Sequence, residues 1–392
     1  MFGRFHHSSL SAVFILLACL GCLPNLEAAS YSFSIVDLGR GYAGEPHEMS
    51  PSTIVGNIGV GGAYFEHAVV WSATQNPSYL QTGTYDNSGA TAINNSGRIA
   101  GWSEFNATSS SDIELNHAVF WQSGVRVQLG EPVGADNSYA DAINSSGMAT
   151  GTWDTLPAGA QSNANFHACR WNADHSAVDL SVAGEQASAG SAVNDLGTIA
   201  GYRYYAGSGK QPNYYTAVEW SPNNVATVLP DLYGHGGLAQ VINNSGEIAG
   251  VDMNSSNQRL PFYYDGQIHA LPTYAGASNY EITGINSSGT IVGYASLGSG
   301  YVPLLWLNGQ VYDLQSLAPP FTASYGTVTL SQPFSINDSG NILVSGTTPS
   351  PFSAIRPYEL MAVPEPASGS IILGFCVVTL CRRRKRLAAV LR

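Results

Sequence analysis

The chain has 392 residues, of which 43 are Gly and 21 are Tyr, and only 11% carry a charge. Long amphipathic helices need many charged residues at their surface, so this composition excludes a mainly helical protein. Gly, Asn, Ser, Thr, Tyr and Val instead suit strands joined by tight turns. Between residues 30 and 362, eight Lys and Arg stand against 25 Asp and Glu, a net charge near −17. Because such a surface repels phosphate backbones, we expect no nucleic-acid partner.

The N-terminus predicts a secretory signal peptide over residues 1–29. Arg4 precedes an apolar run from Leu10 to Leu23, and small residues follow at Ala28 and Ala29. This run falls short of the ~20 residues that cross a bilayer. The order of charge, apolar core and small residues is typical of a cleaved export signal. We expect cleavage after Ala28 or Ala29.

The cysteines give the middle of the chain no disulfide framework. Cys19 and Cys22 lie in the expected signal, Cys376 and Cys381 lie near the C-terminus, and Cys169 alone remains. An exported domain over residues 30–362 must therefore be held by packing and hydrogen bonds. The sequence LLAC that ends at Cys19 loosely resembles a lipoprotein box, which is an alternative to the cleaved signal.

The C-terminal residues 363–392 consist of three parts in order. A short rigid segment is followed by the apolar residues 368–381 and then by a basic cluster. The residues of the first and third parts are Val363, Pro364, Glu365 and Pro366, and Arg382, Arg383, Arg384, Lys385 and Arg386. The positive-inside rule leaves the basic cluster cytoplasmic. We expect a hydrophobic helix over 368–381 that spans the inner membrane transiently, since the stretch is marginal for a permanent anchor.

This arrangement resembles the PEP-CTERM sorting domain of Gram-negative bacteria over about residues 363–386. The resemblance implies that an exosortase-type transpeptidase recognises Val363 to Pro366 and removes the tail. It also implies delivery to the cell surface or the extracellular matrix, where exopolysaccharide or a surface protein would be the partner. An ordinary C-terminal membrane anchor is the alternative.

An internal repeat occupies the middle of the chain. Six segments place Asn-x-x-Gly after an apolar residue and before a short apolar pair, as in AINNSGRIAG from Ala92. The key asparagines are Asn94, Asn144, Asn194, Asn243, Asn286 and Asn337, at spacings of 50, 50, 49, 43 and 51 residues. A worn seventh copy, EMSPSTIVG, ends at Gly56. A period of 45 to 50 residues predicts a stacked repeat architecture.

Each repeat reads as four antiparallel strands. The residues before Asn alternate like a strand, Asn-x-x-Gly supplies a turn in which Asn caps its own backbone, and the apolar pair returns as a second strand. An HAxxW element forms a third strand, as at His67, and a short strand ending near Asp-Leu forms the fourth, as at Ala177. Four strands in this length correspond to one propeller blade.

Blades must stack to bury both faces, so we predict an all-β, seven-bladed β-propeller of four-stranded antiparallel blades. The last repeat lacks its fourth strand, and residues 31–38 at the N-terminus offer one. Pairing the two would close the ring and protect its edges. An open solenoid or a different blade count is the alternative.

The repeat resembles the HAF family of extracellular repeat proteins, named for a His-Ala-Phe element. The first three copies keep His-Ala, and the next three replace the histidine; the residues are His67, His117, His167, Thr216, Pro261 and Pro303. The resemblance covers nearly the whole domain and implies an extracellular location without implying an activity.

The sequence gives little support to a metal site, a phosphate-binding loop or a catalytic nucleophile. The three repeated histidines recur once per blade, over 10 Å apart for packed sheets, whereas zinc ligands must converge on one ion. The Asn-x-x-Gly turns lack the alternating carboxylates of a calcium loop, although a weak calcium site elsewhere stays open. AGSGKQ at Ala206 lacks the spacing of a phosphate loop, and His235-Gly236-Gly237 has no serine elbow to serve. We therefore expect no metal, no cofactor and no catalytic residues.

The favoured hypothesis is a non-enzymatic surface or matrix protein that binds a polymer or a protein through loops at one face. Aromatic side chains could stack on sugars, although they could equally pack between blades: Trp102, Trp153, Tyr202, Tyr204, Tyr205, Tyr214 and Tyr215. The rival is a secreted carbohydrate-active enzyme with two carboxylates about 5 to 10 Å apart in the channel. An ice- or mineral-binding role would require a flat Thr-rich face, which the repeat lacks.

Overall fold

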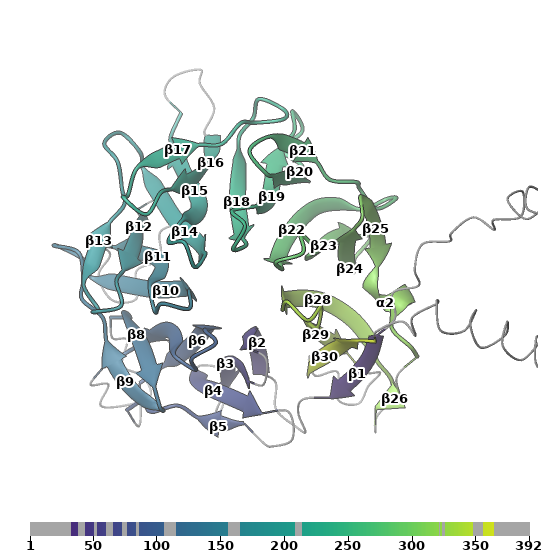
Figure 1. Ribbon diagram of the computed structural model, residues 1–392, viewed down its shortest axis with the longest axis horizontal. Coiled ribbons are helices and arrows are strands. Elements are labelled where there is room, and N and C mark those ends of the chain that lie inside the picture. Colours follow the sequence, from purple (N-terminus) through teal and green to yellow (C-terminus); the bar gives the residue numbers. More distant parts are fainter. Residues whose placement is uncertain are drawn as a thin grey trace, which may run out of the picture. The chain divides into compact units, whose positions relative to one another are not determined.

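Seven four-stranded antiparallel sheets surround a central axis (Figure 1). This architecture is seen in a computed structural model. The model describes residues 33–37, 44–50, 53–59, 66–72, 77–83, 86–105, 115–155, 165–207, 214–320, 322–323, 326–347 and 356–363. The prediction of a seven-bladed, all-β propeller is confirmed. The unit spans Phe33–Ala362, and the predicted signal peptide and nearly all of the predicted sorting tail lie outside the described residues.

Six blades are continuous in sequence, with the first strand nearest the axis (Figure 1). Blade one contains β2 (Gly44–Ser50), β3 (Thr53–Gly59), β4 (Glu66–Ser72) and β5 (Ser78–Tyr79). Blade two contains β6 (Ser88–Ile93), β7 (Ile99–Ser103), β8 (His117–Gln122) and β9 (Val125–Gln128). Blade three contains β10 (Asn137–Ile143), β11 (Ala149–Asp154), β12 (His167–Trp171) and β13 (Ala177–Asp179). Blade four contains β14 (Ala187–Val193), β15 (Ile199–Tyr205), β16 (Tyr214–Trp220) and β17 (Ala226–Val228). Blade five contains β18 (Gly237–Ile242), β19 (Ile248–Met253), β20 (Arg259–Tyr264) and β21 (Ile268–Ala270). Blade six contains β22 (Ser278–Ile285), β23 (Ile291–Leu297), β24 (Gly300–Leu307) and β25 (Gln310–Asp313).

The seventh blade combines both ends of the propeller sequence. From the axis outward it contains β28 (Thr329–Ile336), β29 (Ile342–Thr347), β30 (Arg356–Ala362) and β1 (Phe33–Asp37). Strand β1 pairs antiparallel with β30, so that Phe33 lies opposite Ala362 and Asp37 lies opposite Tyr358. Phe33 is buried.

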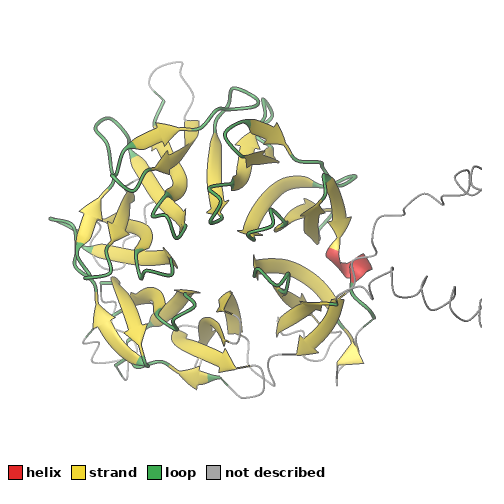
Figure 2. Cartoon of the chain, viewed as in Figure 1, coloured by secondary structure: helices red, strands yellow, loops and turns green. Residues whose placement is uncertain are grey.

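Among the described residues, one short helix interrupts the all-β pattern. Helix α2 (Leu314–Leu317), red in Figure 2, follows β25, and a two-stranded hairpin of β26 (Thr322–Ala323) and β27 (Gly326–Thr327) precedes β28. The Asp313 carboxylate caps the helix by accepting from the Gln315 N–H at 2.8 Å. Within the described part of the chain, no helix is long and apolar enough to cross a membrane. The hydrophobic helix expected over 368–381 falls outside that part.

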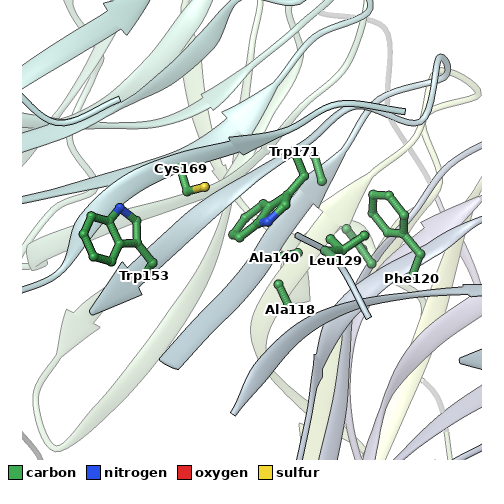
Figure 3. Packing of buried hydrophobic residues seen from close by; sticks show 10 residues of the cluster. Ala118, Phe120, Leu129, Ala140, Trp153, Cys169 and Trp171 are labelled. Atoms are coloured by element: carbon green, nitrogen blue, oxygen red, sulfur yellow. The ribbon is translucent and has the colours of Figure 1, made fainter. Parts of the chain in front are cut away.

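The core lies between neighbouring blades and is built from the HAxxW strands. Trp121, Trp171 and Trp220 are fully buried, and Trp171 packs with Phe120, Ala140 and Cys169 in one cluster (Figure 3). Each indole also donates to a carbonyl of the preceding segment; the bond of Trp171 to Gly130 O measures 2.7 Å. The tryptophan therefore fills the gap between blades and bonds across it.

Candidate functional site

The repeat asparagines hold each turn and also connect the blades. In blade three, the Asn144 Oδ1 accepts from the N–H groups of Ser146 and Met148, at 3.1 and 2.9 Å. The Asn144 Nδ2 donates 2.9 Å to the carbonyl of Asn194 in the next blade. The same bond to the next repeat asparagine recurs for Asn94, Asn194, Asn243 and Asn286. These residues serve the fold rather than a ligand.

The strands nearest the axis share a β-bulge that places one residue of each blade at the same position. The bulge residues lie three positions before the repeat asparagine, or before Ser50 at the equivalent place in blade one, and they are His47, Thr91, Asp141, Ser191, Gln240, Thr283 and Phe334. Bulges re-aim side chains and often occur beside functional sites. The ring of bulge residues is thus the first place to look for binding chemistry.

Two bulge residues bridge to the following blade, but Asp141 does not. The Thr91 hydroxyl donates to the carbonyl of Ala140, and the Gln240 Oε1 accepts from the Ile282 N–H at 3.0 Å. For Asp141, the carbonyl equivalent to that of Ala140 belongs to Gly190. A carboxylate has no proton to offer this acceptor. Among the described residues Asp141 makes no hydrogen bond, and its side chain is exposed.

A pocket of about 410 Å³ opens at this point between blades three and four. Its volume lies within the usual range of ligand sites, about 300 to 1,000 Å³. The lining combines a carboxylate, three hydroxyls, one phenyl ring and small residues: Asp141, Thr152, Phe166, Ala189, Gly190, Ser191 and Tyr202. The main chain of Phe166 is fixed to blade four, because its carbonyl accepts from the Ser188 N–H at 2.7 Å.

The preceding interface shows why the pocket exists. Between blades two and three, Trp102 and Tyr139 stand at the positions of Thr152 and Ala189. Their rings meet edge to face with centroids 6.2 Å apart, and the Tyr139 hydroxyl accepts from Asn116 at 3.0 Å. Two aromatic side chains thus fill the space that Thr and Ala leave empty one blade later.

The pocket is electrostatically one-sided, since its lining contains a carboxylate and no basic side chain. Desolvation by the surrounding protein raises the pKa of the Asp141 carboxyl above its ordinary value, although the side chain stays in contact with solvent in the pocket. Burial also raises the pKa of the Tyr202 phenol, with smaller contributions from Tyr215 and Asp141.

A strip of tyrosines runs from the pocket wall along β15 and β16. Tyr202 contacts Tyr215 at 5.7 Å between ring centroids, and Tyr215 contacts Tyr204 at 4.9 Å. Tyr205 and Tyr214 stack on the opposite face of the same hairpin, because successive strand residues point to opposite faces; their ring centroids lie 5.1 Å apart and their planes are only 15° from parallel. Tyr214 is 43% exposed. Of the other aromatic candidates, Trp153 is buried against His167, which leaves it no surface for a sugar.

The three repeated histidines lie in separate environments. His67 meets the edge of Tyr79, His117 lies 2.5 Å from the Glu131 carboxylate, and His167 lies against Trp153. Within the ranges that the structure describes, no three His, Cys, Asp or Glu side chains are grouped to hold a metal ion.

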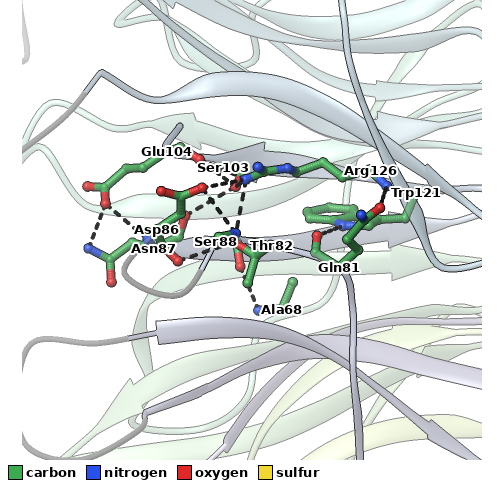
Figure 4. Close-up of polar contacts among 11 residues, drawn as sticks. Ala68, Gln81, Thr82, Asp86, Asn87, Ser88, Ser103, Glu104, Trp121 and Arg126 are labelled. Carbon is green, nitrogen blue, oxygen red and sulfur yellow. Dashed lines mark hydrogen bonds and ion pairs between the residues drawn. The ribbon is translucent and has the colours of Figure 1, made fainter. Parts of the chain in front are cut away.

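Several buried carboxylates are engaged in contacts between strands and blades (Figure 4). Asp86 lies 3.0 Å from the Arg126 guanidinium, which also donates 2.6 Å to Ser103. The Glu104 carboxylate accepts from the main-chain and side-chain N–H groups of Asn87, at 2.9 and 3.1 Å. These contacts hold the segment that enters β6 against β7 and β9 within blade two.

The predicted sorting motif can be placed only in part. Val363 is 46% exposed directly after β30. Pro364, Glu365, Pro366 and the basic cluster of 382–386 lie outside the described residues.

The pocket residues were not singled out by the sequence, apart from Tyr202. The repeat sequence nevertheless contained a pattern that could have identified the position of Asp141. When the copies are aligned on their asparagines, the position three residues earlier varies between repeats and holds a carboxylate only at Asp141, whereas the turn itself is nearly constant.

Comparisons with known proteins show the fold alone. Neither a protein-family model nor a curated protein matches this sequence. The β-propeller domain of the Trilobed protease from Pyrococcus furiosus, which has an open velcro topology, is similar with a TM-score of 0.52, 9% identity, and 82% of this chain and 96% of that chain covered. Pyrococcus horikoshii acylaminoacyl peptidase is similar with a TM-score of 0.52 and 10% identity, and the match covers 85% of this chain and 54% of that chain. Virginiamycin B lyase from Staphylococcus aureus is similar with a TM-score of 0.50 and 11% identity, and the match covers 85% of this chain and 100% of that chain.

Proposed function

We propose that this chain is an exported surface or matrix protein whose propeller binds an extracellular polysaccharide without turning it over. The observation that carries the proposal is the pocket between blades three and four, continuous through Tyr202 with the tyrosine strip. Hydroxyls and a carboxylate suit sugar hydroxyl groups, and aromatic rings suit the apolar faces of sugars. A row of rings beyond a single pocket suits a polymer better than a small metabolite.

The two ends of the chain provide the export signal and the sorting signal. The signal peptide over 1–29 exports the chain, and an exosortase-type enzyme removes the tail at Val363 to Pro366. Both cuts spare the strands that pair in blade seven, since β1 begins at Phe33 and β30 ends at Ala362. We infer that β1 closes the ring of the mature protein by this pairing.

A binding role is supported by the use of the acidic groups. Asp86 and Glu104 make structural contacts within blade two, and desolvation is the sole cause of the raised pKa of Asp141. A carboxylate partner about 5 to 10 Å away, as in glycoside hydrolases, would raise that pKa further by repulsion.

Binding is tested with the chain purified after export from a Gram-negative host and applied to a glycan array. Ala189→Tyr restores the aromatic residue that fills the preceding interface, and Val228→Tyr adds the same side chain to the exposed outer strand of the same blade. We expect a glycan signal that A189Y abolishes and V228Y retains. A signal indifferent to A189Y, or release of shortened glycans, would overturn the proposal.

Sorting is tested separately in a host that has an exosortase-type enzyme. Pro364→Ala combined with Glu365→Ala should leave the tail attached and the chain in the membrane fraction, whereas Arg392→Ala should be processed normally. Normal processing of the double variant would contradict recognition at this motif.

A further inference from the structure

Asp141 is a carboxylate without a partner in a pocket without a cation. Thr152, Ser191 and Tyr202 approach it from β11, β14 and β15, and Phe166 completes the wall. The arginine nearest in sequence to this wall, Arg203, is buried and lies 3.2 Å from Glu185, with its guanidinium facing Trp220. The pocket therefore offers one negative charge that no side chain of its lining neutralises.

The remaining lining suits a compact cation. Phe166 and Tyr202 present two aromatic rings, whose faces attract cations. The Thr152 and Ser191 hydroxyls can accept hydrogen bonds from an ammonium group. A carboxylate, hydroxyl acceptors and ring faces together match –NH₃⁺, which has three donors and no acceptor.

The net negative charge of the whole domain also favours a cationic ligand. With signal and tail removed, it carries about −17. Such a surface repels polymers of uronic or sulfated sugars and attracts cationic ones. The raised pKa of Asp141 agrees, because the desolvation of its carboxylate in the pocket destabilises an anion that an incoming cation would restabilise.

We propose that the pocket binds the free ammonium group of an amino sugar residue within a polysaccharide. This inference rests on the proposed function and names its ligand class: a glycan with free amines rather than N-acetylated, neutral or acidic sugars. Asp141 pairs with the ammonium, Phe166 and Tyr202 enclose it, and the tyrosine strip carries the neighbouring sugar residues.

The test is calorimetric titration of the exported chain with short glucosamine oligomers and with N-acetylglucosamine oligomers of equal length. Acetylation removes the charge and leaves the sugar ring, so it isolates the ammonium. A charge-assisted bond exceeds a neutral one by more than 1 kcal/mol, so we expect the free amine to bind about tenfold more tightly. Asp141→Asn should remove that preference, whereas Glu219→Gln, which removes a carboxylate from β16 of blade four, should keep it.

The outcomes separate the two proposals. Equal affinity for both oligomers, with binding lost in A189Y, would overturn the ammonium and leave a glycan-binding pocket. A D141N variant that keeps the preference would also overturn it. A lysine oligopeptide that binds as tightly as the glucosamine oligomer would overturn the assignment to a sugar. Absence of binding to any glycan would overturn both proposals.

Discussion

The asparagine bonds between blades provide a direct test of how the ring is held together. Asn144→Asp keeps the Oδ1 that accepts from Ser146 and Met148, but it replaces the Nδ2 donor to Asn194 O with a second oxygen. Asn144 is 4% exposed, so the Asn194 carbonyl loses its bond out of reach of water. An unpaired buried acceptor costs about 1 to 3 kcal/mol, and the adjacent buried charge adds to this. We expect Asn144→Asp to lower the free energy of unfolding by about 3 kcal/mol.

The matched control is Asn337→Asp. The Asn337 Oδ1 accepts from Ser339 and Asn341, both at 3.0 Å, in the same kind of turn. Within the described residues its Nδ2 donates to no other blade, so this variant should lose less than 1 kcal/mol. Urea unfolding followed by tryptophan fluorescence measures both. Equal losses in the two variants would show that the bond between blades contributes nothing beyond the turn.

Three further substitutions probe the core and the pocket. Burial raises the pKa of Asp252 from its ordinary 3.8 to about 7, so its ionisation costs stability as the pH rises from about 4 through 7. Asp252→Asn should therefore stabilise the fold at pH 8 by up to about 4 kcal/mol and leave it unchanged near pH 4, as urea unfolding at the two pH values would show. Trp171→Phe removes the bond to Gly130 O and should cost about 2 to 3 kcal/mol in the same assay; a loss below 1 kcal/mol would contradict the role of the indole N–H. Gly190→Ala places a Cβ 2.0 Å from the Thr150 Oγ1 and should lower the melting temperature by several degrees, and adding Thr150→Ala should recover much of that loss.

The repeat pattern was sufficient to predict the blades because the turn is a local device. Asn94 and Gly97 determine a tight hairpin within a few residues, and Gly97 takes a φ of +78° that other residues rarely adopt. The bond from the Asn94 Nδ2 to Asn144 O was not predictable in the same way. It joins residues 50 positions apart and exists only once the blades are stacked.

The pocket depends on two substitutions in different repeats. Thr152 in blade three and Ala189 in blade four are ordinary strand residues when each copy is read alone. Only the strand registers show that both take the places of Trp102 and Tyr139 across one interface. Asp141 likewise reads as one surface carboxylate among 25 until the bulge turns it into that space.

The interface that contains the pocket keeps the bonds found at its neighbours. The Trp220 indole donates to Leu180 O at 3.1 Å, the Ser188 hydroxyl accepts from Ala168 N at 2.9 Å, and Asn144 reaches Asn194. These bonds lie at strand positions outside the pocket lining, so blades three and four remain joined around the pocket without the two aromatic side chains that pack between blades two and three. In this repeat, the hydrogen bonds that join neighbouring blades are therefore made by other residues than those that fill the space between the blades. One interface can therefore contain a pocket while the bonds that join its two blades are kept.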